Sequence, residues 1–203
     1  TYKNKGSKKA ILLGLKFTGE NIEKVIEKIE KLKNMICTNS PIVGNRYMRI
    51  YCWRGGMRSA SVAWLAEILE INAIVLKGGY KSYRNWVLRQ FEKKWQLKLI
   101  GGRTGTGKTD LLKSIKSKGY SIIDLEGLAN HRGSSFGHLG LEEQPTNEQY
   151  ENKIAEALNK TLLNEFKTIY LENESANLGK CRIPNELFKQ MNNSSVIEIR
   201  RSK

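Results

Sequence analysis

The positions of apolar residues in the first half of the chain predict alternating helices and strands. Residues 20–34 place five apolar side chains at helical spacing among Lys and Glu residues, which predicts an amphipathic helix: Ile22, Val25, Ile26, Ile29 and Leu32. Short apolar runs at 47–52 and 73–76 predict buried strands, and the segments 59–70 and 82–95 after them predict helices. Strands that alternate with helices indicate an α/β fold with a parallel sheet.

The second half of the chain repeats this alternation. Apolar runs predict further strands at 97–101, 121–126, 168–175 and 195–200. A helix is predicted at 110–118, and another runs from the capping pattern of Thr146 and Gln149 to about Phe166. Residues 127–145 between them are predicted to form a loop. The sequence therefore predicts two α/β domains, residues 1–95 and residues 96–203.

The charge of the chain is strongly positive and changes the range of expected partners. Lys and Arg number 35 and Asp and Glu number 20, which gives a formal net charge of +15 over 203 residues. A positive field of this size favours a polyanionic partner such as a nucleic acid. A lysine-rich solvated surface accounts for the charge equally well, so the charge alone leaves both interpretations open.

Several classes of protein are not favoured by the sequence. An apolar run long enough to cross a bilayer is absent from it, so a membrane protein is not expected. The three cysteines have no pairing pattern and the two histidines no zinc-ligand spacing, which fits the reducing cytoplasm and disfavours disulfides and zinc. Because the chain begins with Thr1, we expect it to be a fragment of a longer protein.

A cysteine loop follows the first predicted strand. In the segment YCWRGGMRS, Cys52 ends the strand, Gly55 and Gly56 permit a tight turn, and Arg58 adds a cation at the start of a helix. Aligned backbone N–H groups, a helix N-terminus and a cation lower the pKa of a thiol, so Cys52 is predicted to be a nucleophile. The alternative is a buried structural cysteine, which is the interpretation favoured for Cys37 and Cys181.

The length of this loop leaves two chemistries open. The order of strand, cysteine loop, helix, strand and Gly-Gly resembles the active-site segment of rhodaneses. Five residues separate the cysteine from the arginine, which is the spacing of cysteine phosphatases and suits a tetrahedral phosphoryl group. The loop is thus predicted to bind an anionic donor, and the choice between a sulfur or selenium carrier and a phosphatase stays open. The donor-binding residues are Trp53, Arg54, Gly55, Gly56 and Met57.

A phosphate-binding loop follows the strand at 97–101. The segment GRTGTGKT fits the pattern G-x-x-x-x-G-K-[ST], with a predicted strand before it and a helix after it. Its backbone N–H groups would cradle a diphosphate or triphosphate, Lys108 would hold terminal oxygens, and Thr109 would ligate Mg²⁺. The predicted phosphate-binding residues are Gly102, Gly105, Gly107, Lys108 and Thr109.

Carboxylates lie near the ends of two further predicted strands. Asp124 and Glu126 end one strand, and Glu172 and Glu174 end the other. Beside a phosphate loop these side chains are candidates for Mg²⁺ or general-base roles, and solvated strand ends are the equal alternative. The loop at 128–140 offers His131 and Arg132 for substrate contacts, or it is a surface loop.

The two loops together resemble one enzyme family. CWRGGMRS, GRTGTGKT, DLEGLANHRGSSFG and ENES occur in this order, and the chain resembles the tRNA 2-selenouridine synthase family from about Tyr2 to its end. The resemblance implies a rhodanese-like domain at 1–95 that lacks its N-terminal part. It also implies a P-loop NTPase-like domain at 96–203 that lacks its C-terminal part. Asn173 stands where an acidic residue is expected between the two glutamates.

The resemblance implies a function for each loop. The family replaces sulfur by selenium in 2-thiouridine at the tRNA wobble position, through a geranylated intermediate, with selenophosphate as donor. Cys52 would carry or attack selenium while Arg58 and the glycines hold the donor anion. The P-loop would bind the diphosphate of geranyl diphosphate, or a nucleotide, with Mg²⁺ as a candidate ion. The implied partners are tRNA and a selenophosphate-producing enzyme, in the cytoplasm.

Two other functions remain open from the residues themselves. The first is a rhodanese-type sulfurtransferase or a cysteine phosphatase that uses Cys52, with the P-loop as a regulatory nucleotide switch. The second is a nucleotide-binding module without enzymatic activity, in which Cys52 is inert. Activity on thiosulfate or an aryl phosphate without tRNA would distinguish the first, and nucleotide binding beside an unreactive thiol would distinguish the second.

Overall fold

The structure of the chain is a computed structural model, which describes residues 2–19, 21–38, 47–54, 56–103, 106–132 and 140–200. The chain divides into two compact units, Thr1–Tyr83 and Arg84–Lys203. The division lies within helix α4 (Gly79–Glu92), upstream of the predicted boundary at residue 95. It lies there because Arg84 forms an ion pair with Glu151 and donates to Asn152 at 2.9 Å, both in the second unit.

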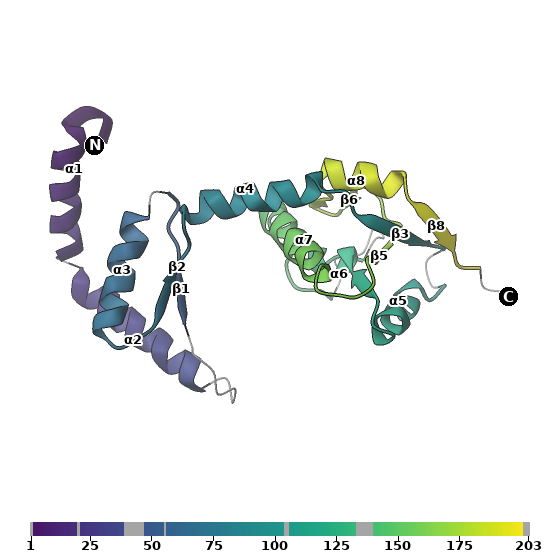
Figure 1. Cartoon of the computed structure of the whole chain (residues 1–203), viewed down its shortest axis with the longest axis horizontal. Helices are drawn as coiled ribbons and strands as arrows, with labels where there is room; N and C mark the ends of the chain where they lie inside the picture. The colour runs from purple at the N-terminus through teal and green to yellow at the C-terminus, as the bar shows by residue number, and fades with distance from the viewer. Residues whose placement is uncertain are drawn as a thin grey trace. The chain divides into compact units, whose positions relative to one another are not determined.

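The first unit contains a βαβ unit preceded by two helices (Figure 1). Strands β1 and β2 pair in parallel, with Met48 opposite Ala73, and α3 connects them. Each predicted helix and strand of this region is present within a few residues of its expected limits. These elements are α2 (Ile22–Thr38), β1 (Met48–Ile50), α3 (Met57–Ile68) and β2 (Ala73–Val75), whereas the helix α1 (Tyr2–Gly19) was not predicted.

A small apolar core holds the first unit together. The predicted apolar face of α2 contributes Ile29, which is 3% exposed, and α3 contributes Leu65 and Ala66. Met48 of β1 and Ile71 before β2 complete the buried cluster. This packing fixes α3 against the strand that precedes it, and therefore fixes both ends of the cysteine loop.

A parallel sheet organises the second unit. Among the described residues the sheet has four strands in the order β4-β5-β3-β8, and every pairing is parallel. Right-handed crossovers then send α5 and α8 to opposite faces of the sheet, as Figure 1 shows. The strands are β3 (Gln96–Gly101), β4 (Ser121–Ile123), β5 (Thr168–Glu172) and β8 (Ser195–Glu198), and the helices are α5 (Lys108–Ser117), α6 (Leu125–Ala129), α7 (Asn147–Thr161) and α8 (Asn185–Asn192).

Some predicted limits in the second unit were wrong. The strand predicted to reach residue 126 ends at Ile123, because Asp124 accepts from Gly127 N at 2.7 Å and caps α6. The predicted capping of α7 is confirmed, since Thr146 Oγ1 accepts from Gln149 N at 3.2 Å.

The helix α7 ends at Thr161 and not near Phe166. Beyond its end, Asn164 donates to Ser121 Oγ at 2.8 Å and Phe166 stacks on Tyr120, so this segment returns to the sheet.

Four elements of the second unit were not predicted at all. Besides α6, these are α8 and the short antiparallel pair β6 (Asn177–Leu178) and β7 (Cys181–Arg182). The mixed α/β class with parallel sheets is confirmed, and the rhodanese-like character of the first unit stays a prediction. Among the described helices, none has the length and apolar character that crossing a bilayer requires.

Candidate functional site

The cysteine loop connects β1 to α3, and hydrogen bonds from the start of α4 hold its backbone. Cys52 is half-buried just after β1. Its carbonyl oxygen accepts from Tyr80 N at 2.8 Å, and the Trp53 carbonyl accepts from Lys81 N at 3.3 Å. The first N–H groups of a helix have no partners within the helix, so those of α4 are satisfied here by the loop that carries the thiol.

Gly79 is the residue that allows this approach. Its φ is +67°, and a Cβ at this position would overlap the carbonyl oxygen of Cys52. The second glycine of the Gly-Gly pair after β2 is therefore required both by backbone conformation and by space. The sequence showed the pair, and the structure shows that it supports the cysteine loop.

Ser59 in the first turn of α3 binds the sulfur of Cys52. The Ser59 hydroxyl lies 3.4 Å from Sγ and 2.9 Å from the Gly56 carbonyl, and Sγ lies 3.2 Å from the Arg54 carbonyl. The Ser59 hydroxyl bond lowers the pKa of the Cys52 thiol, with smaller contributions from the backbone of Ser59 and Gly56 and the charge of Arg58, against a partial desolvation. Sequence reasoning missed Ser59, although its place one turn into the helix after the loop was visible.

The start of α3 offers backbone donors to an anion. Gly56 is the N-cap residue with φ 81° and ψ −19°, and no described side chain caps the helix. By contrast, Asp124 and Thr146 cap α6 and α7 with their side chains. N–H groups that no side chain caps and the helix dipole favour a negative charge at this end of α3. The backbone of Ser59 and Gly56 already acts on the Cys52 sulfur in this way, and binding of a donor anion by the loop stays a prediction.

The other predicted residues of the cysteine loop lie at its surface. Gly55 lies outside the described residues. The side chains of Trp53, Arg54, Met57 and Arg58 are exposed. The thiol and the cation of Arg58 thus lie on a loop that is open to a ligand from solution.

The predicted phosphate loop follows β3 and leads into α5. Gly107 is the N-cap residue of α5 with φ 90°, again with no capping by a described side chain. Lys108 Nζ donates to the Gly102 carbonyl at 3.1 Å, so the lysine folds back across the loop. Gly105 and the side chain of Thr109 lie outside the description.

The strand order places the phosphate loop at a switch point of the sheet. The helices after β3 and β5 leave toward opposite faces, and in open α/β sheets ligands bind beyond the carboxyl ends of adjacent strands at such a point. Asn173 N donates to the Ile100 carbonyl at 2.9 Å, which extends the pairing of the two strands to their carboxyl ends. Gly102 and Glu174 both follow these strand ends.

Three carboxylates gather near these strand ends. Carboxylate oxygens of Glu126, Glu172 and Glu174 all lie within 4.8 Å of one another. Burial and then the charge of Glu126 raise the pKa of Glu174, and the charge of Lys108 opposes this shift. Lys108 therefore acts electrostatically on this group. Oxygen ligands of this kind suit Mg²⁺ and not the softer zinc.

The remaining predicted residues have other roles. Asp124 does not join the carboxylate group, because it caps α6. His131 is 8% exposed and packs against Gly179 in the turn between β6 and β7, which removes it from ready contact with a substrate. Arg132 is exposed.

The other cysteines differ from Cys52. Cys181 is buried and its pKa is raised by burial, as expected of a structural thiol. The side chain of Cys37 lies outside the described part of the chain.

The family comparison matches the second half of the chain. Residues 95–203 match the AAA domain of tRNA 2-selenouridine synthase, a P-loop domain. This matched range contains the P-loop, the three carboxylates and the whole four-stranded sheet. No solved structure matches the chain.

Curated relatives match nearly the whole chain. A tRNA 2-selenouridine synthase of Sulfurovum sp. is 35% identical over 200 residues, which is 97% of this chain and 51% of the relative. One of Bdellovibrio bacteriovorus is 34% identical over 205 residues, 98% of this chain and 51% of the relative. One of Pseudomonas putida is 41% identical over 146 residues, 70% of this chain and 39% of the relative. The chain spans about half the length of the first two relatives.

Proposed function

Because the chain belongs to the tRNA 2-selenouridine synthase family, we propose that it is part of a tRNA-modifying transferase that replaces sulfur by selenium in 2-thiouridine at the wobble position. The observation that supports this proposal is the presence, in one matched chain, of two different loops that each lead into a helix whose start no described side chain caps. One has a thiol of lowered pKa, and the other is a P-loop beside three carboxylates. Each loop takes one step of the exchange.

The P-loop takes the step that activates the sulfur. We assign geranyl diphosphate to it, with the backbone N–H groups at Gly107 and the ammonium of Lys108 on the diphosphate. The thiocarbonyl sulfur of the nucleoside forms a bond to C1 of the geranyl group, and the bond from C1 to the diphosphate oxygen breaks. Charge develops on the leaving diphosphate, so donors already directed at it lower the barrier.

The acidic group beside the P-loop fits a divalent cation. Glu126, Glu172 and Glu174 supply hard oxygen ligands within one small volume. When bound there, Mg²⁺ would neutralise charge on the diphosphate. Burial, and then the charge of Glu126, raises the pKa of Glu174, and a cation held there would favour its charged form.

The cysteine loop takes the step that delivers selenium. The thiolate of Cys52 attacks the phosphorus of selenophosphate, an S–P bond forms, and the P–Se bond breaks to release hydroselenide. Hydroselenide then adds to C2 of the nucleoside and displaces the geranyl thiolate, which takes up a proton. Water cleaves the S–P bond, so phosphate leaves and Cys52 is restored. The uncapped N–H groups of α3 and Arg58 hold the phosphoryl oxygens throughout.

The partners of this reaction follow from its chemistry. The net charge of +15 would bind tRNA through its phosphates, with a strong dependence on salt. Selenophosphate must come from an enzyme that makes it. A reactive thiol such as Cys52 is maintained in a reducing compartment, so we propose the cytoplasm as its location.

The test is nucleoside mass spectrometry with the protein at its full natural length. Tests use 2-thiouridine tRNA, geranyl diphosphate and selenophosphate, with wild type, Cys52→Ala and Lys108→Ala. Cys52→Ala should stop at the geranylated nucleoside, and Lys108→Ala should leave 2-thiouridine unchanged. An unchanged nucleoside in the wild-type reaction would overturn the proposal.

A second function is favoured by one observation. The lowered pKa of the Cys52 thiol, with the Ser59 hydroxyl beside its sulfur and five residues between it and Arg58, would equally serve a cysteine phosphatase or a sulfurtransferase. In that case the P-loop would be a regulatory nucleotide site. Turnover of an aryl phosphate or thiosulfate that requires Cys52 and is independent of tRNA would favour this alternative.

A further inference from the structure

Four aromatic rings are packed beside the cysteine loop. Trp53 stacks on Tyr80 with ring centroids 5.4 Å apart and planes 26° from parallel. Tyr51 and Tyr83 flank Tyr80 at 6.0 and 5.8 Å. We call these four residues the aromatic platform. All four lie in the first unit, and Tyr51 and Trp53 are the immediate neighbours of Cys52 in the chain.

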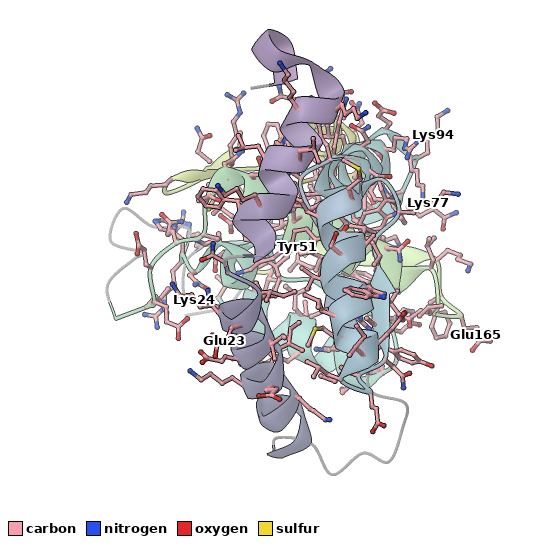
Figure 2. All side chains as sticks on the ribbon, turned by 90° about the vertical axis from the view of Figure 1, so that its left-hand side faces the viewer. Glu23, Lys24, Tyr51, Lys77, Lys94 and Glu165 are labelled. Atoms are coloured by element: carbon pink, nitrogen blue, oxygen red, sulfur yellow. The ribbon has the colours of Figure 1, made fainter. Side chains whose placement is uncertain are left out.

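The outer rings of the platform are exposed. Tyr51 is 62% exposed and Trp53 is 56% exposed, whereas Tyr80 beneath them is half-buried (Figure 2 labels Tyr51). A large ring usually buries most of its surface, so two such rings at one loop leave an unusual amount of aromatic surface in contact with water. The loop backbone that carries Trp53 is also held in place, because the Cys52 and Trp53 carbonyls accept from the first N–H groups of α4.

All charged residues in the sequence around the platform are cations. Residues 47–58 and 76–83, which carry all four rings, contain five cations and no acidic residue: Arg49, Arg54, Arg58, Lys77 and Lys81. Each of these five side chains is exposed (Lys77 is labelled in Figure 2). Planar rings that are interspersed with cations bind single-stranded nucleic acid, with bases on the rings and phosphates on the cations.

We propose that the aromatic platform stacks an unpaired base of the RNA substrate. The stacked base would place the neighbouring nucleotide of the RNA loop, the one to be modified, next to Cys52. Trp53 is the principal stacking residue, Tyr51 extends the surface, and the flanking cations hold the phosphates on either side. This inference rests on the proposed function, because it names the residues that recognise its RNA. A prenyl chain is a poorer occupant, since it gains nothing from the cations and would favour an enclosed apolar groove.

The experiment measures RNA affinity in the full-length protein by fluorescence anisotropy. The probe is a labelled anticodon stem-loop with 2-thiouridine in the loop, titrated at several salt concentrations. The variants are Trp53→Ala, Trp53→Phe and Tyr51→Ala, with Trp64→Ala as matched control. Trp64 is 59% exposed on α3 of the same unit and outside the platform. Lys81→Ala reports the phosphate contacts.

Stacking and charge leave different signatures in these titrations. Trp53→Ala should weaken binding about tenfold or more at every salt concentration, with the salt slope unchanged. Tyr51→Ala should weaken it less, Trp53→Phe should keep most of the affinity, and Trp64→Ala should match wild type. Lys81→Ala should instead reduce the salt slope by about one.

Three results would overturn the inference. They are an unchanged RNA affinity in both Trp53→Ala and Tyr51→Ala, an equal loss in Trp64→Ala, or a loss of geranyl diphosphate binding with RNA binding intact. The nucleoside assay on the same wild-type sample separates this inference from the proposed function. Selenouridine formation with platform-independent RNA binding refutes the platform alone, and an unmodified nucleoside refutes the function.

Discussion

The hydroxyl of Ser59 lies 3.4 Å from the sulfur of Cys52 and 2.9 Å from the carbonyl of Gly56. A single hydroxyl proton cannot serve both acceptors fully. When Cys52 is a thiol, its own proton can go to the Arg54 carbonyl at 3.2 Å, and Ser59 can donate to Gly56. When Cys52 is a thiolate, the stronger acceptor is the sulfur, so Ser59 stabilises the charged form.

The first prediction concerns this hydroxyl. Ser59→Ala should raise the pKa of Cys52 toward that of an ordinary thiol, since the Ser59 hydrogen bond is the largest cause of the lowered value. The measurement is the rate of iodoacetamide alkylation against pH, whose midpoint should move to higher pH in the variant. Ser61→Ala is the control, because Ser61 donates to the Met57 carbonyl on the same helix. Coincident pH profiles for Ser59→Ala and wild type would contradict the prediction.

The second prediction concerns the support of the cysteine loop. Gly79→Ala should destabilise the first unit by more than the roughly 1–2 kcal/mol that a positive φ costs, because the new Cβ would overlap the Cys52 carbonyl. Gly119→Ala is the control, since Gly119 has φ +86° and no atom within 4 Å of the added Cβ. Urea unfolding measures both free energies, and alkylation of Cys52 reports the loop. Equal losses in the two variants would show that the overlap is relieved without cost.

The elements that rest on hydrophobic periodicity could be predicted from the sequence. The α2 face and the strands β1 and β2 follow from apolar positions alone, and so does the P-loop strand β3. Periodicity is reliable there because burial selects one face of an element. It failed at residue 124, where a carboxylate that looked like a strand-end ligand is the N-cap of a five-residue helix.

The candidate site could be predicted in its two loops and not in its supporting contacts. Glu126 reaches the carboxylate group from α6, a helix too short to leave a periodic pattern. Ser59 reaches the sulfur because the loop after Cys52 turns back and places the first turn of α3 beside the thiol. The spacing of the two residues in the sequence does not predict this contact. A glycine-rich loop can be recognised from consecutive residues, whereas a contact between residues that the fold brings together cannot.

The third prediction concerns the acidic group. Glu174→Gln should raise the stability of the metal-free protein at neutral pH, because the folded pKa of Glu174 is raised and its ionisation therefore costs stability. The cost appears as the pH rises from the ordinary carboxyl pKa through the raised one, and it is absent at lower pH. The measurement is the Tm, which should be higher in Glu174→Gln than in the wild type at neutral pH, with the difference lost at low pH.

Magnesium should reverse the order of stability of Glu174→Gln and the wild type. In thermal unfolding, added Mg²⁺ should raise the Tm of the wild type, since a cation at Glu126, Glu172 and Glu174 relieves their repulsion. Glu174→Gln should respond weakly, and Glu156→Gln, an exposed site on α7, should respond like wild type. An equal magnesium response in Glu174→Gln and wild type would remove the metal assignment.

The last prediction concerns the lysine of the P-loop. Lys108 Nζ binds the Gly102 carbonyl at 3.1 Å, and a diphosphate would draw it away from that oxygen. A charge-assisted hydrogen bond contributes about 1.5–3 kcal/mol, so Lys108→Ala should weaken diphosphate binding by roughly 10–100-fold. Calorimetry with inorganic diphosphate and with geranyl diphosphate measures this loss.

Lys113→Ala is the matched control. It removes an equal charge from the exposed side of α5, where Lys113 faces Asp110 at 3.8 Å, and should leave the affinity within about twofold. If both variants lose affinity equally, the lysines act only through the general positive field, and the P-loop is not the diphosphate site.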